Sequence, residues 1–495
     1  MHNNFSLIHL VLLAVLSGAF TSSARAQDSI AANYLRRVVS DPQNALTVLT
    51  TLRQIGGDEL TALYIAASRS SDRNHRMLGT MTLGQFNDPR GHEALIDRID
   101  SDPTSAIRQQ ALGQLVQAGK VDIQTLKRFL DTGDEGLQSI AARAIVMAGE
   151  GQVAMPYLVK LAASNDPATA CLARMNLLTI GQMDQLELLK EIIESPDVTT
   201  EVIEIICLQA MEQKIRPVEG LLERIASGNY PMHVRLRALK ALAELSPDGS
   251  AIVERTLRQS DNIVQRMLLL RMLVLSEHAH KSIENLAGLD DIIGEAARFE
   301  LLRDSSPTDA QSIAMRLIDS KHPIVIGHLL DRISHTIEQD SPTAEVFVRV
   351  LATIVENTPP AVGQLTQSQE HSAWAARMLA DLNTPESMAA LSRLLDSSGY
   401  TASRRAAVAG LLQTTNPQAT AMAHPLLDSP YEELAITAAI AMARHGHDEA
   451  RPYLVNILKN TAHHRQTISI LAAWYLLKLD GQDEKTAAEL AEMVK

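Results

Sequence analysis

Residues 102–119 read DPTSAIRQQALGQLVQAG, and residues 230–249 read YPMHVRLRALKALAELSPDG. The second stretch carries a stripe of leucines with helical spacing, Leu236, Leu239, Leu242 and Leu245. The first stretch opens with an Asp-Pro pair and closes with Gly. An Asp side chain caps free amides in the first turn of a helix, Pro loses no hydrogen bond there, and Gly tolerates the backbone that ends a helix. Each stretch therefore predicts one capped, amphipathic helix.

This pattern recurs along the chain at intervals of about 31 residues. The turn-forming residues that open successive units are Asp41, Asp72, Asp102, Asp134, Asp166, Asp197, Asn229, Asp261, Asp291 and His322. After each of them come an apolar stretch, a break that often contains Gly, and a second apolar stretch. The sequence therefore predicts helical hairpins, about 14 of them from Asp41 onward.

A single hairpin of this kind is unable to bury its own apolar face. Neighbouring hairpins must stack, and stacking produces an elongated array with a continuous core. Only 3% of the residues are aromatic, which fits thin packing between helices that meet through small and aliphatic side chains. The predicted fold class is all-α, an α-solenoid or superhelix of helix-hairpin repeats.

The two quoted stretches resemble HEAT repeats, and more narrowly the HEAT-like repeats of phycobilisome-lyase-type proteins. The likeness rests on a turn Asp or Pro, then Arg108 or Arg235, then Ala111 or Ala238, and a Gly that ends the helix. It covers residues 41–495 and implies that the second helices of the units line a concave surface. Tetratricopeptide repeats fit less well, because they need a longer unit with fixed aromatic positions.

The spacing also predicts how the array is divided. A capping helix at 27–40 precedes repeats at 41–356, and further repeats with a C-terminal cap follow at 370–495. Between His322 and Ser398 the chain is about 14 residues longer than two regular units. We place this surplus at 357–369, as an irregular insertion, a hinge or a longer helix pair.

The first 26 residues predict an export signal. Leu10–Phe20 is apolar, and Ala24-Arg25-Ala26 is the small-x-small pattern of a cleavage site, although the leading segment has no Lys or Arg. The alternative, a membrane anchor, fits less well because Phe5–Phe20 falls short of the roughly 20 residues that span a bilayer. Cleavage after Ala26 predicts a periplasmic or secreted protein whose mature chain does not insert into a membrane.

The charge balance argues against nucleic-acid binding. The 495 residues carry 45 Lys and Arg against 58 Asp and Glu, a net charge of −13. Residues 1–26 hold one Arg and no acidic residue, so the remainder carries −14. Proteins that bind nucleic acid usually need a basic surface that displaces counterions from phosphates.

The cysteines and histidines predict no metal site and no cofactor. Cys171 and Cys207 are too few for a four-cysteine zinc site or an iron–sulfur cluster, and we expect them to be buried in helix interfaces, with a disulfide as the weaker alternative. Three histidine pairs, His278 with His280, His445 with His447, and His463 with His464, are not expected to converge. His445 and His447 fall in a turn within a unit, whereas His463 and His464 open the next unit.

Cations at one equivalent position of the second helices form a candidate partner-binding ladder. Arg128, Lys160, Arg316 and Arg393 occupy this position, and Arg98 and Arg224 lie close to it in the alignment of the units. The alternative is that they are solvated and neutralised on their own helices, because an Asp follows three residues after Arg128, Arg316 and Arg393. Glu191 interrupts the ladder at one position.

No catalytic motif stands out in the sequence. It contains no GxSxG elbow, no phosphate loop of the GxxxxGK[ST] type and no GxGxxG after a strand. We therefore predict a non-catalytic scaffold that binds a protein partner along its surface. An enzyme accessory or lyase-type protein acting on a cofactor or chromophore is the alternative. A weaker third hypothesis is recognition of an acidic or carbohydrate polymer through Trp374, Trp474 and Tyr475.

Overall fold

The computed structural model describes residues 30–195, 198–303, 305–338, 344–359, 367–396 and 401–494. Within these ranges the regular elements are helices and no strand occurs, which confirms the all-α class. The expected export signal, residues 1–26, lies outside the described residues. None of the described helices combines the length and apolar character that crossing a bilayer requires.

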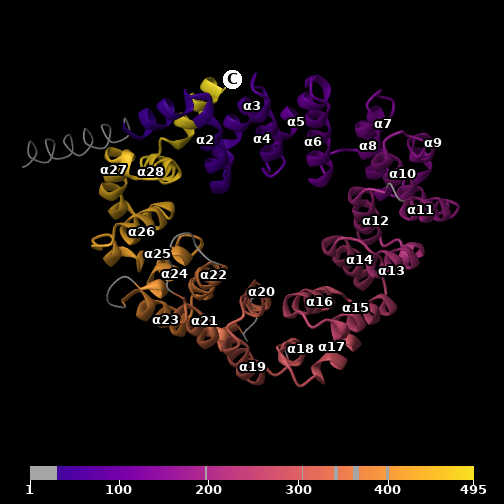
Figure 1. Ribbon diagram of the computed structural model, residues 1–495. Coiled ribbons are helices and arrows are strands. Elements are labelled where there is room, and N and C mark those ends of the chain that lie inside the picture. The colour runs from indigo at the N-terminus through magenta and orange to yellow at the C-terminus, as the bar shows by residue number, and fades with distance from the viewer. Residues whose placement is uncertain are drawn as a thin grey trace, which may run out of the picture. The chain divides into compact units, whose positions relative to one another are not determined.

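The helices alternate along the chain as first and second members of hairpins (Figure 1). The first helices are α2 (Pro42–Ile55), α4 (Arg73–Leu83), α6 (Ser105–Gln117), α8 (Glu135–Met147), α10 (Pro167–Thr179), α12 (Thr200–Glu212), α14 (Met232–Leu245), α16 (Ile263–Leu275), α18 (Ile292–Leu302), α20 (Pro323–Glu338), α22 (Gln367–Leu382), α24 (Ala402–Leu411), α26 (Glu432–Arg444) and α28 (Gln466–Leu479). The second helices are α3 (Thr61–Ser68), α5 (Pro89–Ser101), α7 (Ile123–Leu130), α9 (Gly151–Leu161), α11 (Gln185–Glu194), α13 (Glu219–Ser227), α15 (Pro247–Gln259), α17 (His280–Ala287), α19 (Pro307–Asp319), α21 (Val348–Glu356), α23 (Pro385–Asp396), α25 (Pro417–Ala421), α27 (Arg451–Lys459) and α29 (Asp483–Val494). The chain is a helical repeat array, and the number of about 14 units stays a prediction.

Local sequence signals set the helix ends as predicted. The Asp72 carboxylate accepts hydrogen bonds from the amides of Asn74 and His75, and Asp134, Asp166 and Asp291 cap their helices in the same way. Gly119 and Gly181, which follow first helices, have φ of 64° and 93°, a backbone that other residues rarely adopt. One cap differs from expectation, because Thr104 rather than Asp102 precedes α6.

The chain divides into two compact units, each described here by itself. Unit 1 holds the residues up to Ala118 and those from Ala376 onward, and unit 2 holds Gly119–Asn357 together with the first part of α22, through Ala375. In both units, neighbouring first helices pack against one another. Consecutive second helices pack closely at α3–α5, α15–α17 and α19–α21.

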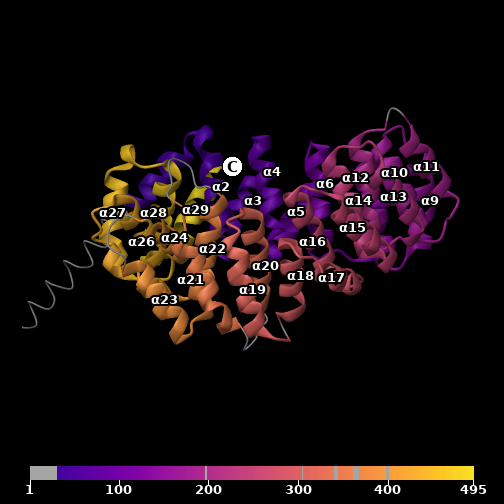
Figure 2. The ribbon, with the colours of Figure 1, turned by 60° about the horizontal axis from the view of Figure 1, so that its bottom comes forward.

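In unit 2 the first helices form the inner layer. Figure 1 shows α12, α14, α16 and α20 on the inner side of this unit's curve, with α11, α13, α15 and α17 outside, and Figure 2 shows the same layering from a second direction. The implication drawn from the HEAT resemblance, that the second helices line the concave side, is therefore wrong for this unit. Successive first helices pack directly against one another in this unit. In a curved two-layer array, the layer whose helices lie closer together is on the inside, which explains why the first helices line the concave side.

In unit 1, helices from opposite ends of the sequence pack together. The α29 helix lies on α3, and α28 lies on α2. Arg36, in the helix at 30–39, pairs with Glu489, and the Lys478 Nζ lies 2.6 Å from the Glu59 Oε1. The two terminal segments therefore contact each other within unit 1, and their role as caps stays a prediction.

The expected irregular stretch at 357–369 is partly helical. Gln367–Gln369 begins α22, Asn357 ends α21, and residues 360–366 lie outside the described residues. The α20 and α22 helices have 16 residues each, whereas α18 has 11. Longer helices thus take up part of the surplus, and the hinge stays a prediction.

Both cysteines are free and buried, as the sequence analysis expected. Burial raises the pKa of the Cys171 and Cys207 thiols to about 12, because an apolar surrounding disfavours the thiolate. The Cys171 Sγ lies 3.8 Å from the Val202 carbonyl oxygen of the next first helix. Both residues serve as small packing groups.

Candidate partner-binding site

The predicted ladder cations lie on second helices, in both units, and most are engaged locally. Arg98 lies 2.9 Å from Asp97, Arg128 lies over the Phe129 ring, Arg224 lies 2.5 Å from Glu194, Arg316 lies 2.8 Å from Glu295, and Lys160 and Arg393 are exposed. The expectation that Arg316 pairs with Asp319 on its own helix is wrong. Arg316 forms an ion pair with Glu295 on the preceding first helix instead. A partner-binding role for these cations stays a prediction.

The histidines of a predicted pair do not share a ligand site. His445 and His447 contact different backbone carbonyl groups. The His445 Nε2 lies 2.9 Å from the Thr414 carbonyl oxygen, and the His447 Nε2 lies 3.2 Å from that of Pro417. His463 lies in the short turn before α28. Across the described ranges, no three His, Cys, Asp or Glu side chains gather in a way that could hold a metal ion.

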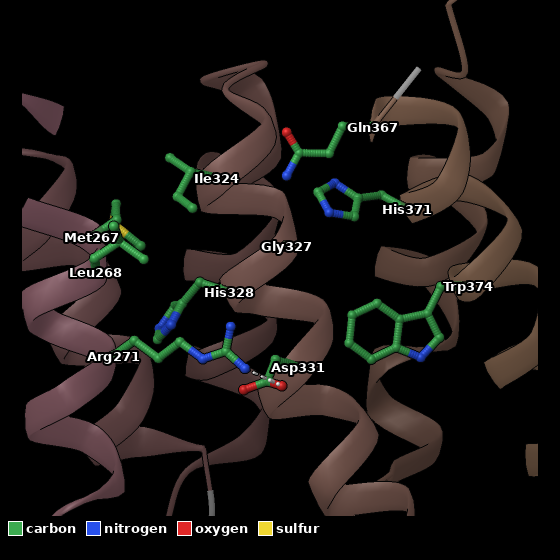
Figure 3. A pocket seen from close by; sticks show the side chains of 10 residues that line it. All are labelled: Met267, Leu268, Arg271, Ile324, Gly327, His328, Asp331, Gln367, His371 and Trp374. Carbon is green, nitrogen blue, oxygen red and sulfur yellow. Dashed lines mark hydrogen bonds and ion pairs between the residues drawn. The ribbon is translucent and has the colours of Figure 1, made fainter. Parts of the chain in front are cut away.

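A half-open cavity of about 140 Å³ lies in unit 2 between α16, α20 and α22 (Figure 3). It exists where the regular stacking of first helices changes. The short α18 helix is covered, its Phe299 is fully buried, and α16 contacts α20 directly. Three first helices thus surround one space, and two of them, α16 and α20, are not consecutive in the array.

Apolar and polar residues share the wall of the cavity. Met267 and Leu268 of α16 face Ile324 of α20, and Trp374 of α22 presents its ring on the other side (Figure 3). Trp374 is half-buried, whereas Trp474 of α28 is fully buried and Tyr475 is nearly so. Of the three aromatic residues that the polymer hypothesis invoked, only Trp374 is therefore placed to contact a ligand.

Gly327 allows the close approach of α22 to α20. A Cβ atom at this position would lie 2.9 Å from the His371 Nε2, tighter than ordinary van der Waals contact. The His371 Nδ1 is buried and has no hydrogen-bonding partner among the described residues. Burial also lowers the pKa of the His371 imidazole, because desolvation disfavours the charged ring. The side chain is a neutral ring with unused hydrogen-bonding capacity at the cavity wall.

An ion pair crosses the lower edge of the cavity. The Arg271 Nη2 of α16 lies 3.0 Å from the Asp331 Oδ1 of α20, and this pair joins helices that are two hairpins apart. Figure 3 shows the guanidinium beside the cavity with Asp331 beneath it. The Arg271 side chain is 48% exposed, so its remaining N–H groups are accessible to a ligand.

Behind the cavity lies a buried charge cluster centred on Glu300 of α18. The His328 Nε2 lies 3.2 Å from the Glu300 Oε1, and the Arg332 Nε and Arg303 Nη1 lie 3.1 and 3.6 Å from its Oε2. Burial alone would raise the pKa of Glu300, but the hydrogen bond from His328 and the neighbouring positive groups outweigh it and hold the pKa below its ordinary value. His328 also lines the cavity, so it connects the cluster to the cavity wall.

Sequence reasoning identified only Trp374 among the residues of this cavity. Arg271, His328 and His371 lie on three different helices and have no motif or local spacing that would associate them. The only available signal was the surplus of residues after His322, which marked the place where regular stacking changes but not the residues that line the resulting space.

No protein-family model and no curated protein sequence matches the chain. Among solved structures, it is similar to the karyopherin Kap121p bound to the SUMO protease Ulp1p, with a TM-score of 0.32, 12% identity and coverage of 96% of this chain and 55% of that one. It is also similar to a homology model of the full-length AP-3 complex, with a TM-score of 0.33, 14% identity and coverage of 97% and 94%. The chain spans little more than half of the Kap121p chain.

Proposed function

We propose that this protein is a non-catalytic scaffold that binds a protein partner on the inner, first-helix layer of unit 2. The cavity between α16, α20 and α22 supports this proposal most directly. It combines apolar walls with a few convergent polar groups, which is the usual composition of a binding pocket. Trp and Arg, which line it, are also the residue types that dominate binding energy at protein interfaces.

Exposed apolar side chains on the same layer support the proposal further. Leu208 of α12 is 37% exposed and Leu275 of α16 is 48% exposed. A partner that binds this layer would contact these exposed apolar groups. The lyase-type alternative stays a prediction that rests on the repeat resemblance alone.

Site-specific photo-cross-linking tests which layer binds the partner. A photoreactive amino acid at Leu268, in the cavity wall, is expected to give a discrete cross-linked protein in an extract of the cells that make this chain. The matched position is Lys160, an exposed ladder residue on the outer helix α9. A cross-link from Lys160 and none from Leu268 would transfer the proposal to the ladder, and no cross-link from either position would contradict a protein scaffold in unit 2.

Export to the periplasm or the outside of the cell is a further part of the proposal. It rests on residues 1–26 of the sequence alone. Sequencing of the amino terminus of the native protein is expected to start at Gln27, and recovery of an intact Met1 would contradict export by this signal.

A further inference from the structure

We infer that the cavity in unit 2 receives one phenylalanine side chain of the protein partner as its anchoring residue. This inference rests on the proposed scaffold function and names the chemical group that the cavity recognises. It follows from the size of the cavity, from the charges of both signs around it, and from the side chains in its wall that favour an aromatic ring.

The volume of the cavity matches a single six-membered ring. It measures about 140 Å³, and an apolar cavity of about 150 Å³ in another protein holds benzene. The indole of a tryptophan is larger than this space. The isobutyl group of a leucine would leave part of the space empty, and the wall would lose packing contacts there. Because the cavity is open on one side, a side chain can enter while its backbone stays outside.

Apolar groups that the fold leaves incompletely covered surround this space. Leu268 of α16, Ile324 of α20 and Trp374 of α22 are each partly exposed. Figure 3 shows Leu268 and Met267 on one side and Trp374 on the other, with the backbone of Gly327 between them. Gly327 adds no side chain to the space between these walls. A ring inserted there removes apolar surface from water on both sides, which is the dominant favourable contribution to most protein associations.

The charged groups around the cavity favour an uncharged side chain. Arg271 and Asp331 pair with each other at 3.0 Å across the lower edge. Glu370 lies beside His371 on α22 and is exposed, and the buried cluster centred on Glu300 behind the wall also contains groups of both signs. A full charge on the ligand would be attracted by one sign and repelled by the other. It would also lose hydration on entering the cavity, a cost that a phenylalanine ring does not have.

Three wall residues favour an aromatic ring over an aliphatic group of the same size. The Trp374 ring borders the cavity, and two aromatic rings attract each other by more than their buried area explains. The Met267 sulfur also makes favourable contacts with aromatic rings. The Arg271 side chain at the lower edge is 48% exposed, and its guanidinium can lie over a ring face while it keeps its pair with Asp331. A saturated ring or a leucine gains none of these contacts.

Fluorescence titration of the full chain with uncharged probes tests this inference. The probes are N-acetyl-phenylalanine amide, N-acetyl-cyclohexylalanine amide, whose saturated ring has a similar size, and N-acetyl-leucine amide. Trp374 and Trp474 are the two tryptophans of the chain, so Trp474→Phe leaves Trp374 as the reporter. The phenylalanine probe is expected to change the emission saturably. It should bind about tenfold more tightly than either comparison probe, because aromatic contacts of the usual strength at two or three walls add up to that ratio.

Two pairs of variants locate the binding. Leu268→Phe places the protein's own ring in the cavity and is expected to weaken the phenylalanine probe by about tenfold or more. Leu188→Phe, at a position of the outer helix α11 that is 36% exposed, should leave binding unchanged. Arg271→Gln should weaken the phenylalanine probe by about threefold and leave the cyclohexylalanine probe unchanged. Its matched control is Arg258→Gln on the outer helix α15, which loses an ion pair with Glu254. Thermal unfolding checks that all four variants are folded.

The outcomes separate this inference from the proposed function. Equal or tighter binding of a comparison probe, no saturable change with any probe, or binding that persists in folded Leu268→Phe would each overturn recognition of a phenylalanine ring. If Leu268→Phe does not fold, an Arg271→Gln variant that weakens all probes equally, or none of them, overturns it instead. If the photoreactive group at Leu268 still cross-links a protein in these cases, the scaffold stands and only its anchoring residue is wrong. If the cross-link also fails, both are wrong.

Discussion

Replacement of Leu490 by Ala in α29 is expected to destabilise unit 1 by about 2–5 kcal/mol, the usual range for a buried leucine. Leu490 is fully buried, and α29 covers α3, whose Leu63 and Tyr64 are fully buried as well. Deletion of Asp483–Val494 removes this cover altogether and should cost more than the single substitution. Such a loss is comparable with the whole stability of many domains.

Urea unfolding followed by Trp474 emission measures this effect, because Trp474 is buried in unit 1 and Trp374→Phe makes it the sole reporter. Met493→Ala is the matched control on the same helix. Its side chain is 41% exposed, so the change should stay within about 0.5 kcal/mol. Equal midpoints for Leu490→Ala and Met493→Ala would contradict the packing of α29 on α3. The ion pair of Arg36 with Glu489 is partly exposed and should contribute little by comparison.

Replacement of Glu300 by Gln is expected to destabilise unit 2 by about 3–5 kcal/mol at neutral pH, because it leaves buried positive groups without their counter-charge. The Glu300 side chain is 5% exposed, and the Arg332 Nε and the Arg303 Nη1 lie 3.1 and 3.6 Å from its Oε2. Glu223→Gln, at an exposed position on α13, is the matched control and should be nearly neutral. Urea unfolding followed by Trp374 emission in the Trp474→Phe background provides the measurement.

The difference between Glu300 and its Gln variant should also depend on pH in a defined direction. The folded-state pKa of Glu300 lies below the ordinary value of 4.5, so its contribution to the free energy of unfolding is fully present above that value and is lost as the pH falls through the folded pKa. Unfolding midpoints of the two proteins should therefore converge in acid. A gap that stays constant or widens below the ordinary pKa would contradict a stabilising ionised Glu300.

The sequence predicted the local structure because its signals are local. Asp72 and Asp166 cap helices through amides within three residues, and Gly119 and Gly181 end helices through their own backbone angles. The packing of α29 on α3 had no such signal. The apolar face of α29 has the same spacing as that of any other repeat helix, and nothing in a periodic pattern states which partner, near or more than 400 residues away, will cover it.

The candidate site was largely beyond prediction for a related reason. The cavity depends on direct contact of α16 with α20 across the covered helix α18, a tertiary displacement that a regular repeat does not encode. Spacing rules similarly placed Arg316 beside Asp319, whereas the structure pairs it with Glu295 from the neighbouring helix. Side-chain spacing along one helix identifies available partners, and the packing of the next helix decides between them.

The association of α3 with α29 has a consequence for biosynthesis. Translation delivers the first 118 residues to the exit tunnel long before Ala376–Lys495, which belong to the same compact unit. At about 5–20 residues per second, the interval is on the order of tens of seconds. During this time Leu63 and Tyr64 lack their cover, while Gly119–Asn357 can already collapse. The nascent amino-terminal segment is thus a natural client for ribosome-associated chaperones, and unit 2 can fold before unit 1 although the first 118 residues are synthesised earlier.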